Sequence, residues 1–271
     1  GAITIITGEA TTGKSGSIIL SVGAGNTGAG GDVELFGGVS NGATGGAISI
    51  ATGYGKTSSS GSLTIQSVNA GTAGVSGSLS FQSGTTSSGS SGQISFTSGA
   101  ATNGKGGDIS LAVGSGNTGV GGDISGSAGS STAATGGSIS LSTGAGRDTS
   151  SGSVILKTVN AGTNGVSGAL KFSTGTTSSG TSGTVAFQTG TATNGKGGDF
   201  SLLVGSGTHF SGGDLTMVAG ETTADSSLGG AVEITAGLGS SSTGASGGDI
   251  KFSAGQGNSA SGGSVSISTG Y

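Results

Sequence analysis

The sequence predicts an all-β fold, a parallel β-solenoid of about eighteen flattened coils, most of them 15 residues long. Three observations support this prediction. A glycine starts each repeat, apolar and polar residues alternate after it, and proline is absent from a chain that contains 66 glycines. A short fixed period is typical of solenoids, in which each coil buries its apolar side chains against the neighbouring coils.

The first half of each repeat has the pattern of a β-strand. The third position is apolar in every repeat, from Ile3 to Val265, and the fifth is Ile, Leu, Phe or Met everywhere except at Gly126. Alternation with a period of two between glycines indicates a strand rather than a helix. The repeats begin at Gly1, Gly16, Gly31, Gly46, Gly61, Gly77, Gly92, Gly107, Gly122, Gly137, Gly152, Gly168, Gly183, Gly198, Gly213, Gly230, Gly248 and Gly263.

The second half of each repeat has the composition of a turn. Gly, Ser, Thr and Asn dominate it, and the eighth position is glycine in all repeats except at Val68 and Val159. Such segments are too short for a crossover helix and tolerate tight turns and positive φ. We expect them to return the chain to the next coil, about 4.8 Å away.

Stacked coils would place the third and fifth positions in two inward columns. Phe81 over Phe96 and Phe172 over Phe187 would then stack directly, and each aromatic pair would contribute about 0.5–1.5 kcal/mol beyond burial. The absence of proline is consistent with stacked coils, because every interior N–H would donate a hydrogen bond to the next coil and proline has no N–H. The predicted core ladder comprises Ile94, Phe96, Ile109, Leu111, Ile139, Leu141, Phe172 and Phe187.

A longer period lies over the short one. The repeats that begin at Gly61 through Gly107 match those that begin at Gly152 through Gly198, at an offset of 91 residues. We therefore expect one continuous solenoid over residues 1–271, with super-repeats at about 1–91, 92–182 and 183–271.

Several functional classes are disfavoured by composition. Charged residues make up 7% of the chain and the net charge is −4, so no basic stripe would attract nucleic acid. No apolar run reaches the roughly 18 residues that membrane insertion requires. His209 is the single histidine and has no identifiable acidic or nucleophilic companion, and carboxylates are dispersed. We predict that the protein is not an enzyme and needs no cofactor.

Calcium is the one ion that the sequence leaves open. Asp108 and Asp123, and likewise Asp199 and Asp214, occupy the second position of successive repeats, where paired carboxylates could share Ca²⁺. The nonapeptide of calcium-binding β-rolls is absent. Lys105 and Lys196, each three residues before an aspartate, offer simpler partners. Solvated turn aspartates are the favoured interpretation.

The ends of the chain suggest a partner. Gly1 starts in register, Tyr271 ends a repeat part-way, and no capping element is visible. Either flanking sequence continues the repeats, or further copies of the chain satisfy the ends head to tail, which generates a filament. The alternative function is a ligand-binding rod for ice or polysaccharide, because outward Ser and Thr could form a hydroxyl array, although the Thr columns are interrupted.

The strings "SGTTSSGSSGQISFTSG" and "GGSISLSTGAG" resemble the Gly/Ser/Thr-rich β-solenoid repeats of large extracellular proteins from algae and other protists, and more loosely bacterial adhesin stalks. The resemblance covers nearly the whole chain. It implies a structural segment of an extracellular or cell-surface fibre, with adhesion as an associated role, and it carries no catalytic residue over to this chain.

Overall fold

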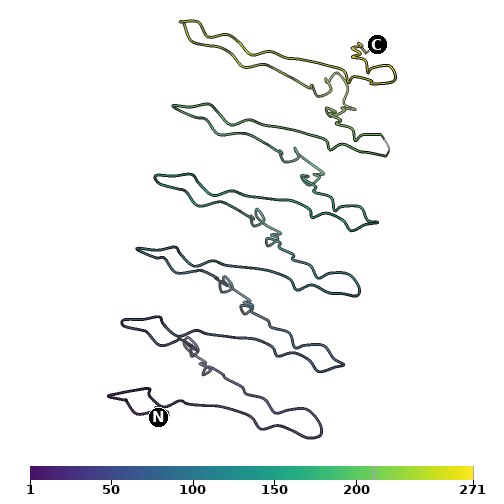
Figure 1. The fold of residues 1–271 in the computed structure, drawn as a ribbon. Helices are drawn as coiled ribbons and strands as arrows, with labels where there is room; N and C mark the ends of the chain where they lie inside the picture. The colour runs from purple at the N-terminus through teal and green to yellow at the C-terminus, as the bar shows by residue number, and fades with distance from the viewer. Residues whose placement is uncertain (210, 271) are drawn as a thin grey trace. The chain divides into compact units, whose positions relative to one another are not determined.

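The computed structural model describes residues 1–209 and 211–270, and these residues form loops joined by extended segments. None of them lies in a helix or a strand, and Figure 1 accordingly shows a thread without coiled ribbons or arrows. The only local elements are short bends and turns. They cover residues 11–13, 26–28, 41–43, 56–58, 72–74, 87–89, 102–104, 117–119, 132–134, 147–149, 163–164, 178–180, 193–195, 208–209, 224–226, 242–244 and 258–260.

The predicted all-β parallel β-solenoid is therefore wrong for the described residues. A parallel solenoid needs a ladder of backbone hydrogen bonds from each coil to the next. Seven of the eight backbone hydrogen bonds between described residues join the two ends of a loop, and the eighth, from Gly165 to Gly162, closes a short turn. No second bond extends any of them into a ladder. The bends do fall in the second half of the repeats, where the composition predicts turns.

A recurring loop replaces the predicted coil. The glycine at the eighth position of one repeat accepts a hydrogen bond, through its carbonyl oxygen, from the N–H of the glycine that starts the next repeat. The chain thus turns back on itself within each repeat of this kind. The N···O distances are 2.8 Å for Gly46–Gly38, 3.1 Å for Gly61–Gly53, 2.8 Å for Gly137–Gly129, 3.1 Å for Gly152–Gly144, and 2.9 Å for Gly230–Gly220, Gly248–Gly237 and Gly263–Gly255.

Close approach explains the starting glycine in some of the repeats. A Cβ atom added to Gly46 would lie 2.8 Å from the backbone nitrogen of Gly38, and one added to Gly31 would lie 2.9 Å from Cγ1 of Val22. Neither distance is sterically acceptable without movement. A different constraint acts further round the loop, where Gly119 adopts a φ of 87° that side-chain-bearing residues rarely populate.

The structure buries little surface. The accessible surface of the chain is 26417 Å², compared with about 10,000 Å² for a compact domain of this mass and about 36,000 Å² for an extended chain. No hydrophobic side chain among the described residues is buried. The seven bonds that close loops are local, so they bring no other repeat over the apolar positions.

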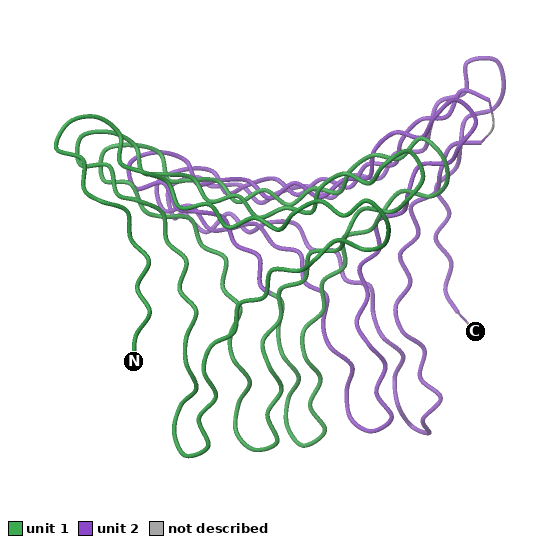
Figure 2. Cartoon of the chain, turned by 90° about the horizontal axis from the view of Figure 1, so that it is seen from below, with its two compact units in different colours: residues 1–139 green, residues 140–271 purple. Residues whose placement is uncertain are grey.

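The chain divides into two units, residues 1–139 and 140–271 (Figure 2). Within each unit, elongated loops project to different sides of the segments that connect them (Figures 1 and 2). The expectation of one continuous unit over residues 1–271 stays a prediction. The super-repeats at about 1–91, 92–182 and 183–271 stay a prediction.

Candidate functional site

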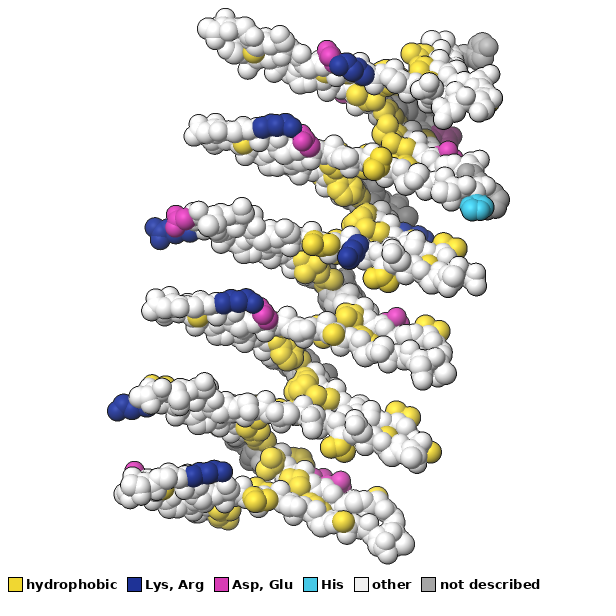
Figure 3. Space-filling view, viewed as in Figure 1, with side chains coloured by type: hydrophobic (Ala, Val, Ile, Leu, Met, Phe, Trp, Pro, Cys, Tyr) yellow, Lys and Arg dark blue, Asp and Glu magenta, His cyan; other side chains and the backbone are white. Residues whose placement is uncertain are grey.

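The predicted core ladder lies on the surface. Its least exposed member is Ile94, at 47%, and its most exposed members are Leu111 and Leu141, at 78%. The sequence places all eight side chains inward, and in the structure each of them is at least 47% exposed. The other members, Phe96, Ile109, Ile139, Phe172 and Phe187, are likewise more than half exposed. Figure 3 shows hydrophobic side chains gathered where loops join the connecting segments.

The two predicted phenylalanine pairs do meet. The ring centroids of Phe81 and Phe96 are 6.2 Å apart with an interplanar angle of 86°, and those of Phe172 and Phe187 are 5.8 Å apart at 84°. Both pairs are edge-to-face rather than stacked. This geometry suits the aromatic quadrupole, which places a positive ring edge against a negative face.

A third aromatic contact was not predicted from the sequence. The rings of Phe187 and Phe200 lie 6.4 Å apart at 34°. Phe200 occupies the third position of its repeat, and Phe187 the fifth position of the preceding one. The apolar character of both positions was visible in the sequence, but contact between different positions was not expected, because coil stacking would bring like positions together.

Two of the four calcium candidates, Asp108 and Asp199, form ion pairs with lysine. Nζ of Lys105 lies 2.7 Å from Oδ2 of Asp108, and Nζ of Lys196 lies 2.7 Å from Oδ1 and 2.9 Å from Oδ2 of Asp199. Both partners are the ones that the three-residue spacing indicated. The side chains are 76–79% exposed, so each pair contributes about 0.2–1 kcal/mol.

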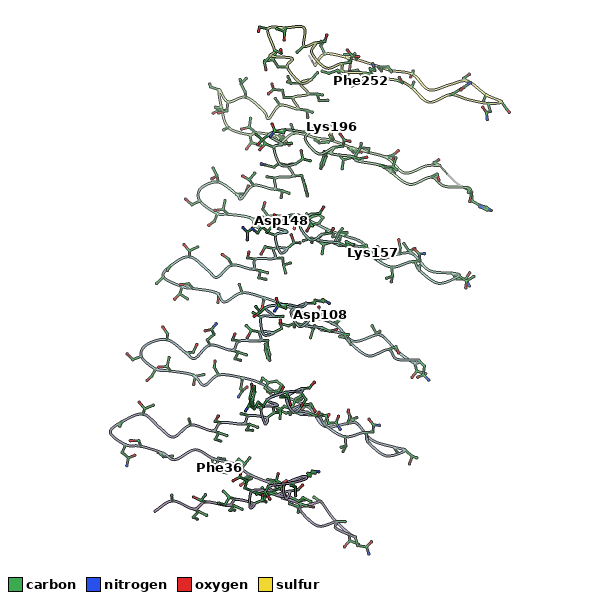
Figure 4. All side chains as sticks on the ribbon, turned by 60° about the vertical axis from the view of Figure 1, so that its left-hand side comes forward. Phe36, Asp108, Asp148, Lys157, Lys196 and Phe252 are labelled. Carbon is green, nitrogen blue, oxygen red and sulfur yellow. The ribbon has the colours of Figure 1, made fainter. Side chains whose placement is uncertain are left out.

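The other two calcium candidates, Asp123 and Asp214, are also exposed. No group of three or more acidic or histidine side chains forms a metal-binding cluster within residues 1–209 and 211–270. A further ion pair, absent from the sequence analysis, joins Nζ of Lys251 to Oδ2 of Asp249 at 3.0 Å. The sequence could have indicated this ion pair, because residues two apart lie on the same side of an extended segment. Figure 4 shows side chains projecting outward from the ribbon, with Asp108 and Lys196 among those labelled.

His209 and a hollow beside Lys157 each lie on a single stretch of chain. Nδ1 of His209 lies 3.2 Å from Oγ1 of the adjacent Thr208, in an exposed bend. The hollow has a volume of about 430 Å³ and is lined by four consecutive residues, Lys157, Thr158, Val159 and Asn160. A single segment supplies all of its lining, so no second element converges on a bound molecule there.

No helix among the described residues is both long and apolar enough to cross a membrane. The search for similar proteins gives no family assignment. No family model matches the chain, and no curated protein or solved structure is similar to it.

Proposed function

We propose that this chain is a structural segment of an extracellular or cell-surface fibre, and that its partner is a further copy of the same chain. One observation carries the proposal: apolar side chains recur at two fixed positions of the repeat and stay uncovered in the isolated chain. Large exposed apolar patches in proteins usually mark interaction surfaces. A repetitive chain presents such side chains many times over, which suits assembly into a filament.

Self-association is favoured by charge as well as by apolar exposure. The chain carries 8 basic and 12 acidic residues over 271 positions. Three of the basic residues are already paired with aspartates two or three residues away. Little like-charge repulsion therefore opposes the approach of a second copy, and burial of apolar side chains between copies would drive association.

Sedimentation and electron microscopy over a concentration series test this proposal. We expect fibres or large assemblies to appear as the concentration rises. A chain that remains monomeric at every concentration would refute self-association, and the alternative of an ice-binding or polysaccharide-binding rod, which stays a prediction, would then be tested by thermal hysteresis and glycan binding.

A matched pair of variants locates the contact. The double variant Phe81→Ser and Phe96→Ser removes two aromatic side chains from the fifth position of the repeat. We expect it to raise the concentration needed for assembly by about two orders of magnitude. The reason is that burial of each Phe contributes about 1.5 kcal/mol or more to association. The control is Val75→Ser with Val120→Ser. Both valines are more than 95% exposed and lie outside the third and fifth positions, so assembly should change little.

A further inference from the structure

Asparagine followed by glycine recurs in the loops of this chain. An Asn-Gly dipeptide marks a tight turn, and it is also the sequence at which asparagine most readily loses its amide, because glycine does not hinder attack by its own backbone nitrogen. The four dipeptides are Asn41-Gly42, Asn103-Gly104, Asn164-Gly165 and Asn194-Gly195. The pairs at 103 and 194 are equivalent positions of the 91-residue offset.

Three of the four dipeptides lie in exposed bends without restraint on the glycine. Both residues of each are exposed and lie in a bend. Within the described chain, the N–H of the glycine donates no hydrogen bond to backbone or side chain in these three, and a Cβ atom built on that glycine would find nothing within 4 Å. These three dipeptides are at residues 41–42, 103–104 and 194–195.

The fourth dipeptide is restrained. The N–H of Gly165 donates to the carbonyl oxygen of Gly162 at 3.4 Å, and Cβ of Ala161 lies 3.4 Å from the position that a Cβ of Gly165 would occupy. The nitrogen that must attack Asn164 is therefore engaged and less free to move. The chain thus allows the Asn-Gly dipeptide to be compared in open loops and in a restrained loop.

We infer that Asn41, Asn103 and Asn194 are sites of spontaneous deamidation through a cyclic succinimide, and that Asn164 is a slower site. The glycine nitrogen gives its proton to water or hydroxide and attacks Cγ of the asparagine. The N–Cγ bond forms, the Cγ–Nδ2 bond breaks, and ammonia leaves. Water then opens the ring at either carbonyl, which leaves aspartate or isoaspartate.

Each conversion changes the loop that carries it. One neutral side chain becomes a carboxylate, so conversion at three sites would take the net charge from −4 to −7. At Asn103 the new carboxylate lies two residues before Lys105, which already pairs with Asp108. Isoaspartate also inserts an extra methylene into the backbone of the bend.

Peptide mapping by mass spectrometry of the full chain, aged at mildly alkaline pH in water enriched in oxygen-18, tests the inference. Heavy oxygen in the product separates ageing from changes during preparation. We expect Asn103 and Asn194 to react at similar rates and Asn164 about two- to fivefold more slowly, as one weak hydrogen bond implies. The Asn-Ala sites at 69 and 160 serve as internal references and should react more slowly than all four.

Two controls separate the loop geometry from the dipeptide alone. Ageing in concentrated urea should equalise Asn164 with the other three sites. The variant Gly104→Ala places its methyl group in open space at an ordinary φ, so it should slow reaction at Asn103 at least tenfold and leave Asn194 unchanged. Equal rates at Asn103 and Asn164 without urea, or rates at Asn103 no faster than at the Asn-Ala sites, would overturn the inference.

Discussion

Heating or urea should unfold this chain without a sharp transition, because little surface remains to be exposed. The accessible surface is 26417 Å², and the fully extended chain would expose about 36,000 Å². Unfolding therefore exposes about 9,000 to 10,000 Å². A compact domain of the same mass would expose about 26,000 Å² on unfolding, so the change expected here is roughly a third of the usual one.

Two measurable quantities follow from that surface. The heat-capacity increment of a compact domain of this length is about 3–4 kcal/mol/K, and a third of it is about 1.2 kcal/mol/K. The dependence of the unfolding free energy on urea should fall in the same proportion, since it scales with exposed surface. Cooperativity should be lost as well, because each loop-closing hydrogen bond lies within a single loop and can open without the others.

Differential scanning calorimetry and urea titration followed by circular dichroism measure these quantities. Both need a dilute sample that sedimentation shows to be monomeric, because association would bury surface between copies. A single sharp endotherm with a heat-capacity increment near 3–4 kcal/mol/K would refute the reasoning. It would mean that the apolar side chains at the third and fifth positions are covered within one chain.

Three further predictions test individual features. The variant Gly46→Ala should speed amide exchange at position 46 about fivefold after correction for the intrinsic rate, because loss of the bond to Gly38 costs about 1 kcal/mol. Gly42→Ala, which places its methyl group in open space of the same loop, should leave that rate unchanged, and equal effects would contradict the proposed loop neck. Brief digestion of the native chain by trypsin should cut after all eight Lys and Arg residues, all of them exposed; a resistant core fragment would argue against open loops. Calorimetric titration with millimolar Ca²⁺ should give no saturable heat, because lysines already pair with Asp108 and Asp199; a saturable heat that Asp108→Asn abolishes would reverse this expectation.

Local features of this chain were accessible from its sequence. The bends fall in the Gly- and Ser-rich half of the repeats, and the three-residue spacing of Lys105 and Asp108 produces the expected ion pair. The contact between Phe81 and Phe96 also follows from the repeat. These features involve residues close together in the chain or one repeat apart, so composition and spacing constrain them directly.

The arrangement of successive repeats was not accessible in the same way. Alternation with a period of two says which side chains share one side of a segment, and it is silent on whether another segment covers that side. In the structure the N–H of Gly46 donates to Gly38 across its own loop, and a donor used there does not join a ladder between coils. Ile48 and Ile50, in the repeat that Gly46 starts, are exposed. Repeat length and turn position are local properties of the chain, whereas burial depends on which distant groups compete for the same backbone donors.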